Sequence, residues 1–232
     1  MAKKRIAIVG GYISEECTLG LKALGYDVLI LPSDDRLGRA VSSHTDLLVF
    51  PFADKLFVYS GEVYSVLAGK ALTAVAVKES PSADYPYDIY LNALTVGKYI
   101  FARKKYLSED IAAEAERLGY TVIDVRQGYA RCTACPISDR AIITADKAIE
   151  NAALSVGIDV LTVAEGGVEL KGYPYGFIGG ACGVDDDTVV FAGDIYTHPS
   201  GTRIVDFCEK HGKRVVSLSG EPLRDVGSIF FV

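Results

Sequence analysis

Cys132 is the residue of this chain whose type and setting first suggest chemistry. It ends the segment Gly128-Tyr129-Ala130-Arg131-Cys132, which places it beside a cation. A thiolate attacks electron-poor carbon, and Arg131 or a cationic substrate would lower the pKa of the thiol. The other interpretation is a buried structural cysteine, which is how most free cysteines are used. The sequence leaves both interpretations open.

Cys132 and Cys135 also form a C-x-x-C pattern, which is typical of zinc and redox sites. A zinc site needs four ligands, and the three histidines and five cysteines offer no second pair at a suitable spacing. On a strand the two side chains would point to opposite faces. We therefore expect neither a metal nor another cofactor.

Asp194 and His198 lie between a predicted strand and a predicted helix. An aspartate that orients an imidazole could form an acid–base pair with it. The alternative for Asp194 is a helix N-cap, because Asp146 occupies the equivalent place one unit earlier.

Three carboxylates, Glu165, Asp88 and Asp225, lie near the starts of predicted inner strands. Carboxylates in such places can hold a guanidinium group through paired hydrogen bonds, although many merely face solvent. Overlaying the predicted hairpins brings Cys182 into register with Asn92, so both are candidates for lining a central pore.

The chain repeats one pattern, an amphipathic helix followed by a glycine and a β-branched strand. The glycines are Gly25, Gly69, Gly119, Gly157 and Gly212. A helix end often needs one residue in the left-handed conformation, which glycine adopts without strain. The gap from the last glycine through the C-terminus to the first is about 45 residues, similar to the others. The incomplete repeat units at the two ends of the sequence therefore combine into one complete unit.

Pairs of strands precede the later helices. We predict 47–51 with 56–59, 89–93 with 99–102, 130–135 with 141–144, and 177–181 with 188–192. Strand 5–9 lacks a hairpin partner, and 227–232 is a strand without a following helix. We predict that these two pair and close a five-bladed α/β propeller of strand–strand–helix–strand units, one domain over 1–232. Closure would leave no exposed sheet edge.

A Rossmann-like sheet is the structural competitor. The strand 6–9 runs into Gly10-Gly11, which resembles a first βα turn, but the G-x-G-x-x-G pattern is absent. Pro32 stands where the next strand should end in an acid. A tight turn before a helix is the favoured interpretation.

Composition narrows the class of protein. The 232 residues are 50% hydrophobic and carry a net charge of -6. Nucleic-acid binding is disfavoured because no basic face can be assembled. The apolar run at 6–9 is too short for a signal peptide or a membrane span. We expect a cytoplasmic protein with reduced thiols, a small-molecule ligand, and neither a nucleic-acid nor a membrane partner. The oligomeric state stays open.

Five such units in a ring is the plan of the guanidine-modifying enzymes, or penteins. The whole chain resembles an uncharacterised bacterial family of that fold. The likeness lies in 128–132, 175–180, 192–194 with His198-Pro199, and 225–229. The named enzymes of this fold include arginine and agmatine deiminases, amidinotransferases and dimethylarginine hydrolases.

The resemblance implies a cysteine nucleophile in a Gly-x-hydrophobic-His-Cys context, where this chain has Arg131 in place of the histidine. The segment Glu165-Gly166-Gly167-Val168 resembles a Glu-Gly-Gly-Asp turn, with Val168 replacing the acid. These enzymes also use a histidine on an inner strand. None of His44, His198 and His211 lies in the middle of a predicted strand.

Two functions follow. The first is a Cys-dependent hydrolase or amidinotransferase-like enzyme acting on a small guanidino or amidino compound. Its catalytic residues would be Cys132, His198 and Glu165, and its substrate-binding residues Asp88, Asn92, Cys182, Asp194 and Asp225. The second is a protein of the same fold without that chemistry, binding a small ligand or a protein partner.

Overall fold

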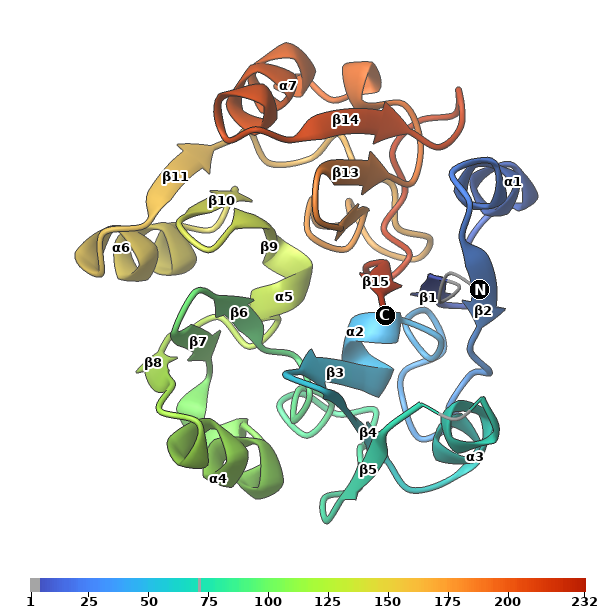
Figure 1. Cartoon of the computed structure of the whole chain (residues 1–232), viewed down its shortest axis with the longest axis vertical. Coiled ribbons are helices and arrows are strands. Elements are labelled where there is room, and N and C mark those ends of the chain that lie inside the picture. Colours follow the sequence, from blue (N-terminus) through green and yellow to red (C-terminus); the bar gives the residue numbers. More distant parts are fainter. Residues whose placement is uncertain (1–4, 71) are drawn as a thin grey trace.

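The computed structural model describes residues 5–70 and 72–232. Within them the strands form five three-stranded sheets, arranged around a common centre (Figure 1). In every sheet the inner strand pairs antiparallel with the middle strand, and the middle strand pairs parallel with the outer one. The predicted unit of strand, strand, helix and strand therefore occurs five times.

The strands fall into three sets by their position in the sheets. The inner strands are β3 (Val49–Phe52), β6 (Leu94–Val96), β9 (Ala134–Ser138), β12 (Cys182–Val184) and β15 (Phe230–Phe231). The middle strands are β4 (Lys55–Tyr59), β7 (Tyr99–Ala102), β10 (Ala141–Thr144), β13 (Thr188–Phe191) and β1 (Ile6–Val9). The outer strands are β5 (Ala74–Val77), β8 (Thr121–Asp124), β11 (Asp159–Thr162), β14 (Arg214–Ser217) and β2 (Asp27–Ile30).

One helix joins each middle strand to its outer strand. These helices are α1 (Glu15–Ala23), α3 (Glu62–Gly69), α4 (Glu109–Arg117), α6 (Lys147–Ser155) and α7 (Gly201–Lys210). The short elements α2 (Thr45–Leu48) and α5 (Ala130–Thr133) precede inner strands, and the 3-10 turns η1 (Lys104–Tyr106) and η2 (Ile195–Thr197) follow middle strands.

Capping side chains and glycines mark several of the helix ends, although the predicted N-cap Ser108 makes no capping hydrogen bond. The side chains of Ser14 and Asp146 accept hydrogen bonds from backbone N–H groups in the first turns of α1 and α6. Four of the five repeat glycines have positive φ, namely Gly25, Gly119, Gly157 and Gly212. Gly69 differs, because α3 continues through it. Ala71, two residues after Gly69 in the same copy of the pattern, lies outside the described residues.

The two ends of the described chain pair as predicted. β15 runs antiparallel to β1, with Phe231 opposite Ala7 and Phe230 opposite Ile8. Ile6 and Val232 exchange two backbone hydrogen bonds, of 2.9 and 3.0 Å. The C-terminal strand thus supplies the inner strand of the N-terminal sheet.

The predicted starts of the inner strands were wrong. Segments 89–93 and 177–181 form turns, and 130–133 and 45–48 are short helices. Their backbone hydrogen bonds are local, as between Asn92 N and Ile89 O or between Thr133 N and Tyr129 O. These runs are apolar and buried in either conformation, so hydrophobic periodicity could not distinguish a turn from a strand. Four of the five inner strands are therefore preceded by a compact turn or a short helix.

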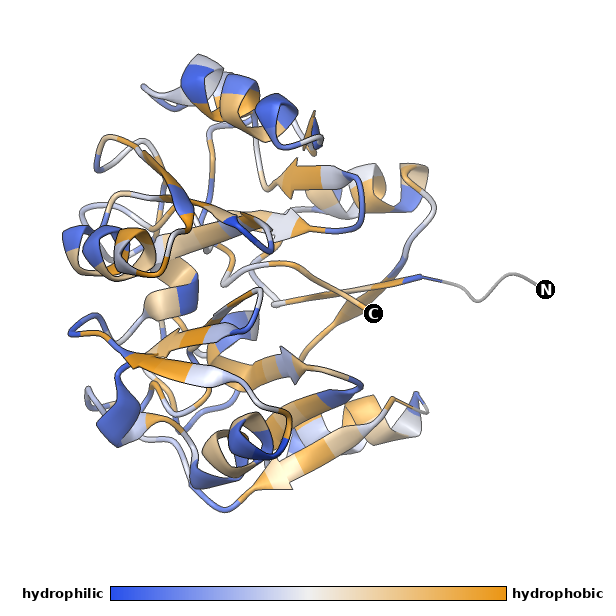
Figure 2. Cartoon of the chain, turned by 60° about the vertical axis from the view of Figure 1, so that its left-hand side comes forward, coloured by the Kyte–Doolittle hydropathy of each residue, from blue (hydrophilic) through white to orange (hydrophobic). Residues whose placement is uncertain are grey.

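The hydrophobic core lies between the sheets. Figure 2 shows the strands as mostly hydrophobic, with polar residues concentrated on helix surfaces and loops. Each of five buried clusters joins residues of two neighbouring sheets. The pairs are β1–β4, β4–β7, β7–β10, β10–β13 and β13–β1, each named by its middle strands. Among the described residues, no helix has the length and apolar character needed to cross a membrane.

Candidate functional site

The turns that precede the inner strands bring polar residues together at the centre of the molecule. Asp46 comes from α2, Asn92 from the turn before β6, Cys132 from α5, and Ser228 from the segment before β15. All four are buried. These residues, with His44 and Asp225, are called the acid pocket below.

Asn92 connects three of the five units through its side-chain amide. Its Nδ2 donates to Cys132 Sγ at 3.1 Å and to the backbone oxygen of Asp46 at 3.1 Å. Its Oδ1 accepts from the backbone N–H of Arg131 at 2.9 Å. The amide has two donors and one acceptor in use, so its orientation is fixed. Asn92 thus positions the thiol.

Asp46 is a buried carboxyl group with one free oxygen. Its Oδ2 contacts Ser228 Oγ at 2.6 Å, while Oδ1 has no partner in the described part of the chain. Ser228 Oγ also lies 3.0 Å from Gly179 O. A hydroxyl has a single proton, so both contacts are satisfied only when Asp46 is protonated. Burial also raises the pKa of Asp46, which agrees with this arrangement.

Asp225 and His44 form the second half of the acid pocket. Asp225 accepts backbone hydrogen bonds from Phe177 and Gly227, at 2.9 and 3.0 Å. Burial raises its pKa to about 6. His44 Nδ1 lies 3.7 Å from Asp225 Oδ1, and its Nε2 has no partner among the described residues. Burial lowers the pKa of His44, so the imidazole is neutral near pH 7.

The electrostatics of Cys132 follow from these neighbours. Its side chain is buried, lies beside the Asp46 carboxyl group and is within the field of Asp225. Burial is the largest effect and the two carboxylates add to it, so the pKa of this thiol is raised well above its usual value. In the ligand-free protein Cys132 is therefore a thiol rather than a thiolate.

Arg131 points away from Cys132 toward the next sheet. Its guanidinium group donates to the backbone oxygens of Ala134, Gly179 and Cys182, at 3.1, 2.9 and 3.3 Å. Both terminal nitrogens lie 3.9 Å from Cys182 Sγ. Within residues 5–70 and 72–232, no carboxylate oxygen comes within 4 Å of this guanidinium. The positive charge of Arg131 thus acts on the Cys182 thiol rather than on the Cys132 thiol.

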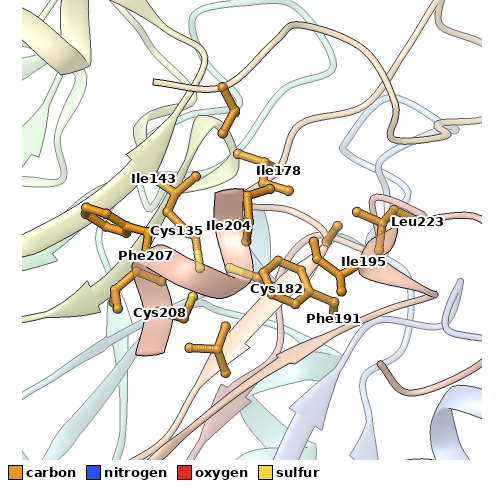
Figure 3. Close-up of a cluster of buried hydrophobic side chains, with 14 of the residues drawn as sticks. Cys135, Ile143, Ile178, Cys182, Phe191, Ile195, Ile204, Phe207, Cys208 and Leu223 are labelled. Carbon is orange, nitrogen blue, oxygen red and sulfur yellow. The ribbon is translucent and has the colours of Figure 1, made fainter. Parts of the chain in front are cut away.

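Cys135, Cys182 and Cys208 form a separate thiol cluster between β9, β12 and α7. Figure 3 shows their three sulfurs facing one another among aliphatic and aromatic side chains. Burial opposes ionisation of Cys182, but the contacts with Cys135 and Arg131 outweigh it and lower the pKa of Cys182. Burial and the contact with Cys182 raise the pKa of Cys135. All five cysteines of the chain are free.

His198 and Glu165 meet at a different place. They line a cavity of about 50 Å³ together with Thr133. His198 Nδ1 accepts from the backbone of Ser200 at 3.0 Å, and Glu165 accepts from Tyr175 Oη at 3.3 Å. Neither makes a hydrogen bond with Cys132 among the interactions of the described residues.

The remaining two candidates have structural partners. Asp194 caps η2 by accepting from the backbone N–H of Tyr196 at 3.0 Å, so the N-cap interpretation holds for it. Asp88 accepts from Tyr129 Oη at 2.6 Å, and burial raises its pKa. Tyr129 lies within electrostatic reach of Cys132, so Asp88 is a neighbour of the acid pocket rather than a member of it.

A groove of about 1130 Å³ covers the acid pocket. Asp225 belongs to both, and the aromatic ring of Tyr12 in the groove lies 6.3 Å from that of His44. The groove is lined by Tyr12, Arg39, Ala40, Glu169, Leu170, Lys171, Tyr173, Pro174, Arg224 and Asp225. The long loop around 166–176 forms one of its walls.

Sequence reasoning missed His44, Asp46 and Ser228. The signal that could have found them is their place in the repeat. Like Asn92 and Cys132, Asp46 and Ser228 lie two or three residues before an inner strand. Among the described residues, no group of three or more His, Cys, Asp or Glu side chains is arranged to hold a metal ion.

The fold is that of the guanidine-modifying enzymes. DDAH from Pseudomonas aeruginosa, complexed with citrulline, aligns with a TM-score of 0.58 and 11% identity over 95% of this chain and 93% of that one. The amidinotransferase SxtG from Microseira wollei gives 0.55 and 11%, over 92% and 88%. C. jejuni agmatine deiminase gives 0.56 and 9%, over 94% and 87%.

The sequence places the chain more narrowly within this fold. Residues 8–230 match the model of the family described as "Family of unknown function (DUF6873)". The chain belongs to this family. Among curated proteins, none matches it in sequence.

Proposed function

We propose that this protein binds a small guanidino or amidino compound in the acid pocket and acts on it through Cys132. The observation that carries the proposal is the unpaired Oδ1 of Asp46 beside that thiol. A buried carboxylate oxygen without a partner is costly, and the planar donor fork of a guanidinium group would satisfy it. The enzymes with the same fold support this choice of ligand class.

A cationic ligand would also activate the thiol. Asp46 and Asp225 raise the pKa of Cys132 because they repel a thiolate. A guanidinium bound between them offsets that repulsion, so ionisation of Cys132 becomes favourable when the substrate is present. Without substrate, Cys132 stays protonated, and this protects it from side reactions.

The chemistry balances with the groups in the pocket. A guanidinium bound at Asp46 favours the ionised form of this carboxyl group, which then takes the proton of the neighbouring Cys132 thiol. Sulfur forms a bond to the amidino carbon, the carbon–nitrogen bond breaks, and the amine leaves with the proton that Asp46 returns. Water then cleaves the carbon–sulfur bond and restores the thiol, or an amine acceptor takes the amidino group instead. We assign proton transfer to Asp46 rather than to His198 and Glu165, which line another cavity.

The same fold without catalysis is the second candidate. The observation in its favour is the raised pKa of Cys132, which makes this thiol a poor nucleophile in the free protein. The pocket would then bind a small cationic ligand without cleaving it. The cytoplasmic location also remains part of the proposal, and the free state of the five cysteines supports it.

We also include in the proposal a ring closed by the terminal strands, with 1–232 as one domain. The β1–β15 pair and the five inter-sheet clusters support closure. Deleting 227–232 should destabilise the protein strongly, because it exposes the edge of β1 and unpacks Ile229. Unfolding at the same temperature as the full chain would contradict closure.

Calorimetry and product analysis separate the two functions. Arginine, agmatine and dimethylarginine are titrated into the protein, and release of ammonia, urea and amines is measured in parallel. For an enzyme, Cys132→Ser should bind but not turn over, while the control Cys17→Ser, a buried thiol in α1, retains activity. Binding without turnover would support the non-catalytic function. Absence of binding by all three, with Asp46→Asn behaving like the parent, would overturn both.

A further inference from the structure

The inner strands line a second cavity, which is separate from the acid pocket and its groove. Each inner strand contributes one residue, and these residues occupy the same register position in the five sheets. In every sheet the residue lies opposite the second of the middle-strand residues that also pair with the outer strand. These residues are Phe50, Thr95, Pro136, Val184 and Phe231, and all of them line one cavity of about 200 Å³. This cavity is called the central channel below.

Among the described residues that line the central channel, Arg131 is the one cation. It is only 6% exposed, and its guanidinium lies 5.5 Å from the ring centre of Phe230, another lining residue. Its hydrogen bonds go to neutral carbonyl groups, both terminal nitrogens lie 3.9 Å from Cys182 Sγ, and no carboxylate oxygen of the described residues lies within 4 Å of the guanidinium. A buried cation that lacks a carboxylate contact attracts an anion.

Thr95 provides a second unsatisfied group in the same cavity. Its Oγ1 is buried and has no hydrogen-bond partner in the described part of the chain. A hydroxyl in this state costs free energy unless a ligand or water completes it. The channel therefore presents a positive charge and a polar donor within walls that are otherwise mostly apolar, including Phe50, Ile229 and Phe231.

The channel has its own access to solvent. A wider cavity of about 770 Å³ shares Thr95, Pro136, Val184 and Phe231 with it and extends to the exposed residues Asp139, Arg140 and Asp186. The groove over the acid pocket shares none of its lining residues with the channel. A ligand can therefore reach Arg131 without passing through the acid pocket.

We propose that the central channel is a binding site for a small monocarboxylate with a short apolar chain. The carboxylate would lie against Arg131 and Thr95, and the chain would contact the aromatic and aliphatic walls. The carboxyl groups of Asp46 and Asp225 lie within electrostatic reach of the Arg131 cation, which disfavours a dianion such as phosphate. The volume suits a chain of about four to six carbons.

Calorimetric titration with butanoate tests the site, with butanamide as the neutral comparison. We expect saturable one-to-one binding of butanoate with a Kd at or below about 1 mM, and at least roughly tenfold weaker binding of butanamide. Thr95→Val removes only the hydroxyl and should weaken butanoate roughly tenfold. Val184→Phe fills the channel and should abolish binding, whereas Arg140→Gln at the outer mouth should leave it unchanged.

Circular dichroism establishes that each variant is folded before it is titrated. Butanoate binding that survives in Val184→Phe but falls in Arg140→Gln would overturn the proposal, because the anion would then be held at the mouth. Equal binding of butanoate and butanamide, or no binding of butanoate, would overturn it as well. None of these results depends on whether Cys132 is catalytic.

Discussion

The acid pocket and the thiol cluster hold the same functional group in opposite surroundings. Cys132 lies beside two buried carboxyl groups, which raise its pKa together with burial. Cys182 is buried as deeply, but it faces the Arg131 guanidinium at 3.9 Å and its pKa is lowered. Burial alone therefore does not decide whether a thiol ionises in this protein. The nearest charge decides it, and Arg131, next to Cys132 in sequence, serves the other thiol.

Removing Arg131 should have the largest effect on this contrast. Arg131→Met removes one donor from each of three buried carbonyl groups and deprives Cys182 of its cation. We expect a loss of about 3–5 kcal/mol in the free energy of unfolding, measured by urea denaturation. The exposed Arg140→Met should change it by less than about 0.5 kcal/mol. Similar small losses in both variants would show that the guanidinium does not hold the two regions together.

The acid pocket should make stability depend on pH in an unusual direction. Asp225 has a pKa of about 6 in the folded protein, against 3.8 ordinarily. Between these values the folded state holds a proton that the unfolded chain has released. Its contribution is therefore complete below about pH 4 and lost as the pH rises through 6, a decrease of about 3 kcal/mol. Chemical denaturation at several pH values measures this slope.

Asp225→Asn is the control for that slope. Asp46, whose pKa is also raised, contributes a decrease of the same sign, while His44, whose pKa is lowered, contributes an increase with pH. Both remain in the variant, so the difference between the two slopes isolates Asp225. A variant with the same slope as the parent would mean that the carboxyl group at 225 is ionised throughout.

The order in which Cys182 and Cys132 ionise tests the contrast between the two regions and should disturb stability least. The ultraviolet absorbance of thiolates is followed as the pH of the native protein is raised. Because its pKa is lowered, Cys182 should ionise before Cys132, whose pKa is raised. The early step should be missing in Cys182→Ala and present in Cys132→Ala. An early step that disappears with Cys132 instead would reverse the assignment of the two thiols.

The sequence predicted the repeat well because its signals are local. Capping residues such as Asp146 and the glycines after the helices mark each unit within a few residues. The inner strands were harder, since the apolar runs 89–93 and 177–181 are buried as turns and would have been buried as strands. Periodicity reports burial, and burial is the same in both conformations.

The candidate site was predictable only in part. Cys132 and Asn92 were selected from the sequence and touch in the structure, and Asp225 lies in the same pocket. Asp46 was missed because its partner Ser228 is 182 residues away, and no local pattern encodes such a contact. Once the repeats are aligned on the starts of the inner strands, these positions agree to within one residue.

The pairing of β1 with β15 has a consequence for mechanical strength. The strands are antiparallel, and Ile6 and Val232 lie side by side at one end of the pair. A force that pulls these two residues apart loads the hydrogen bonds one after another, as in a zipper, rather than all together. Extension from the termini should therefore open this sheet at low force, while the sheets whose strands are joined by short turns remain folded.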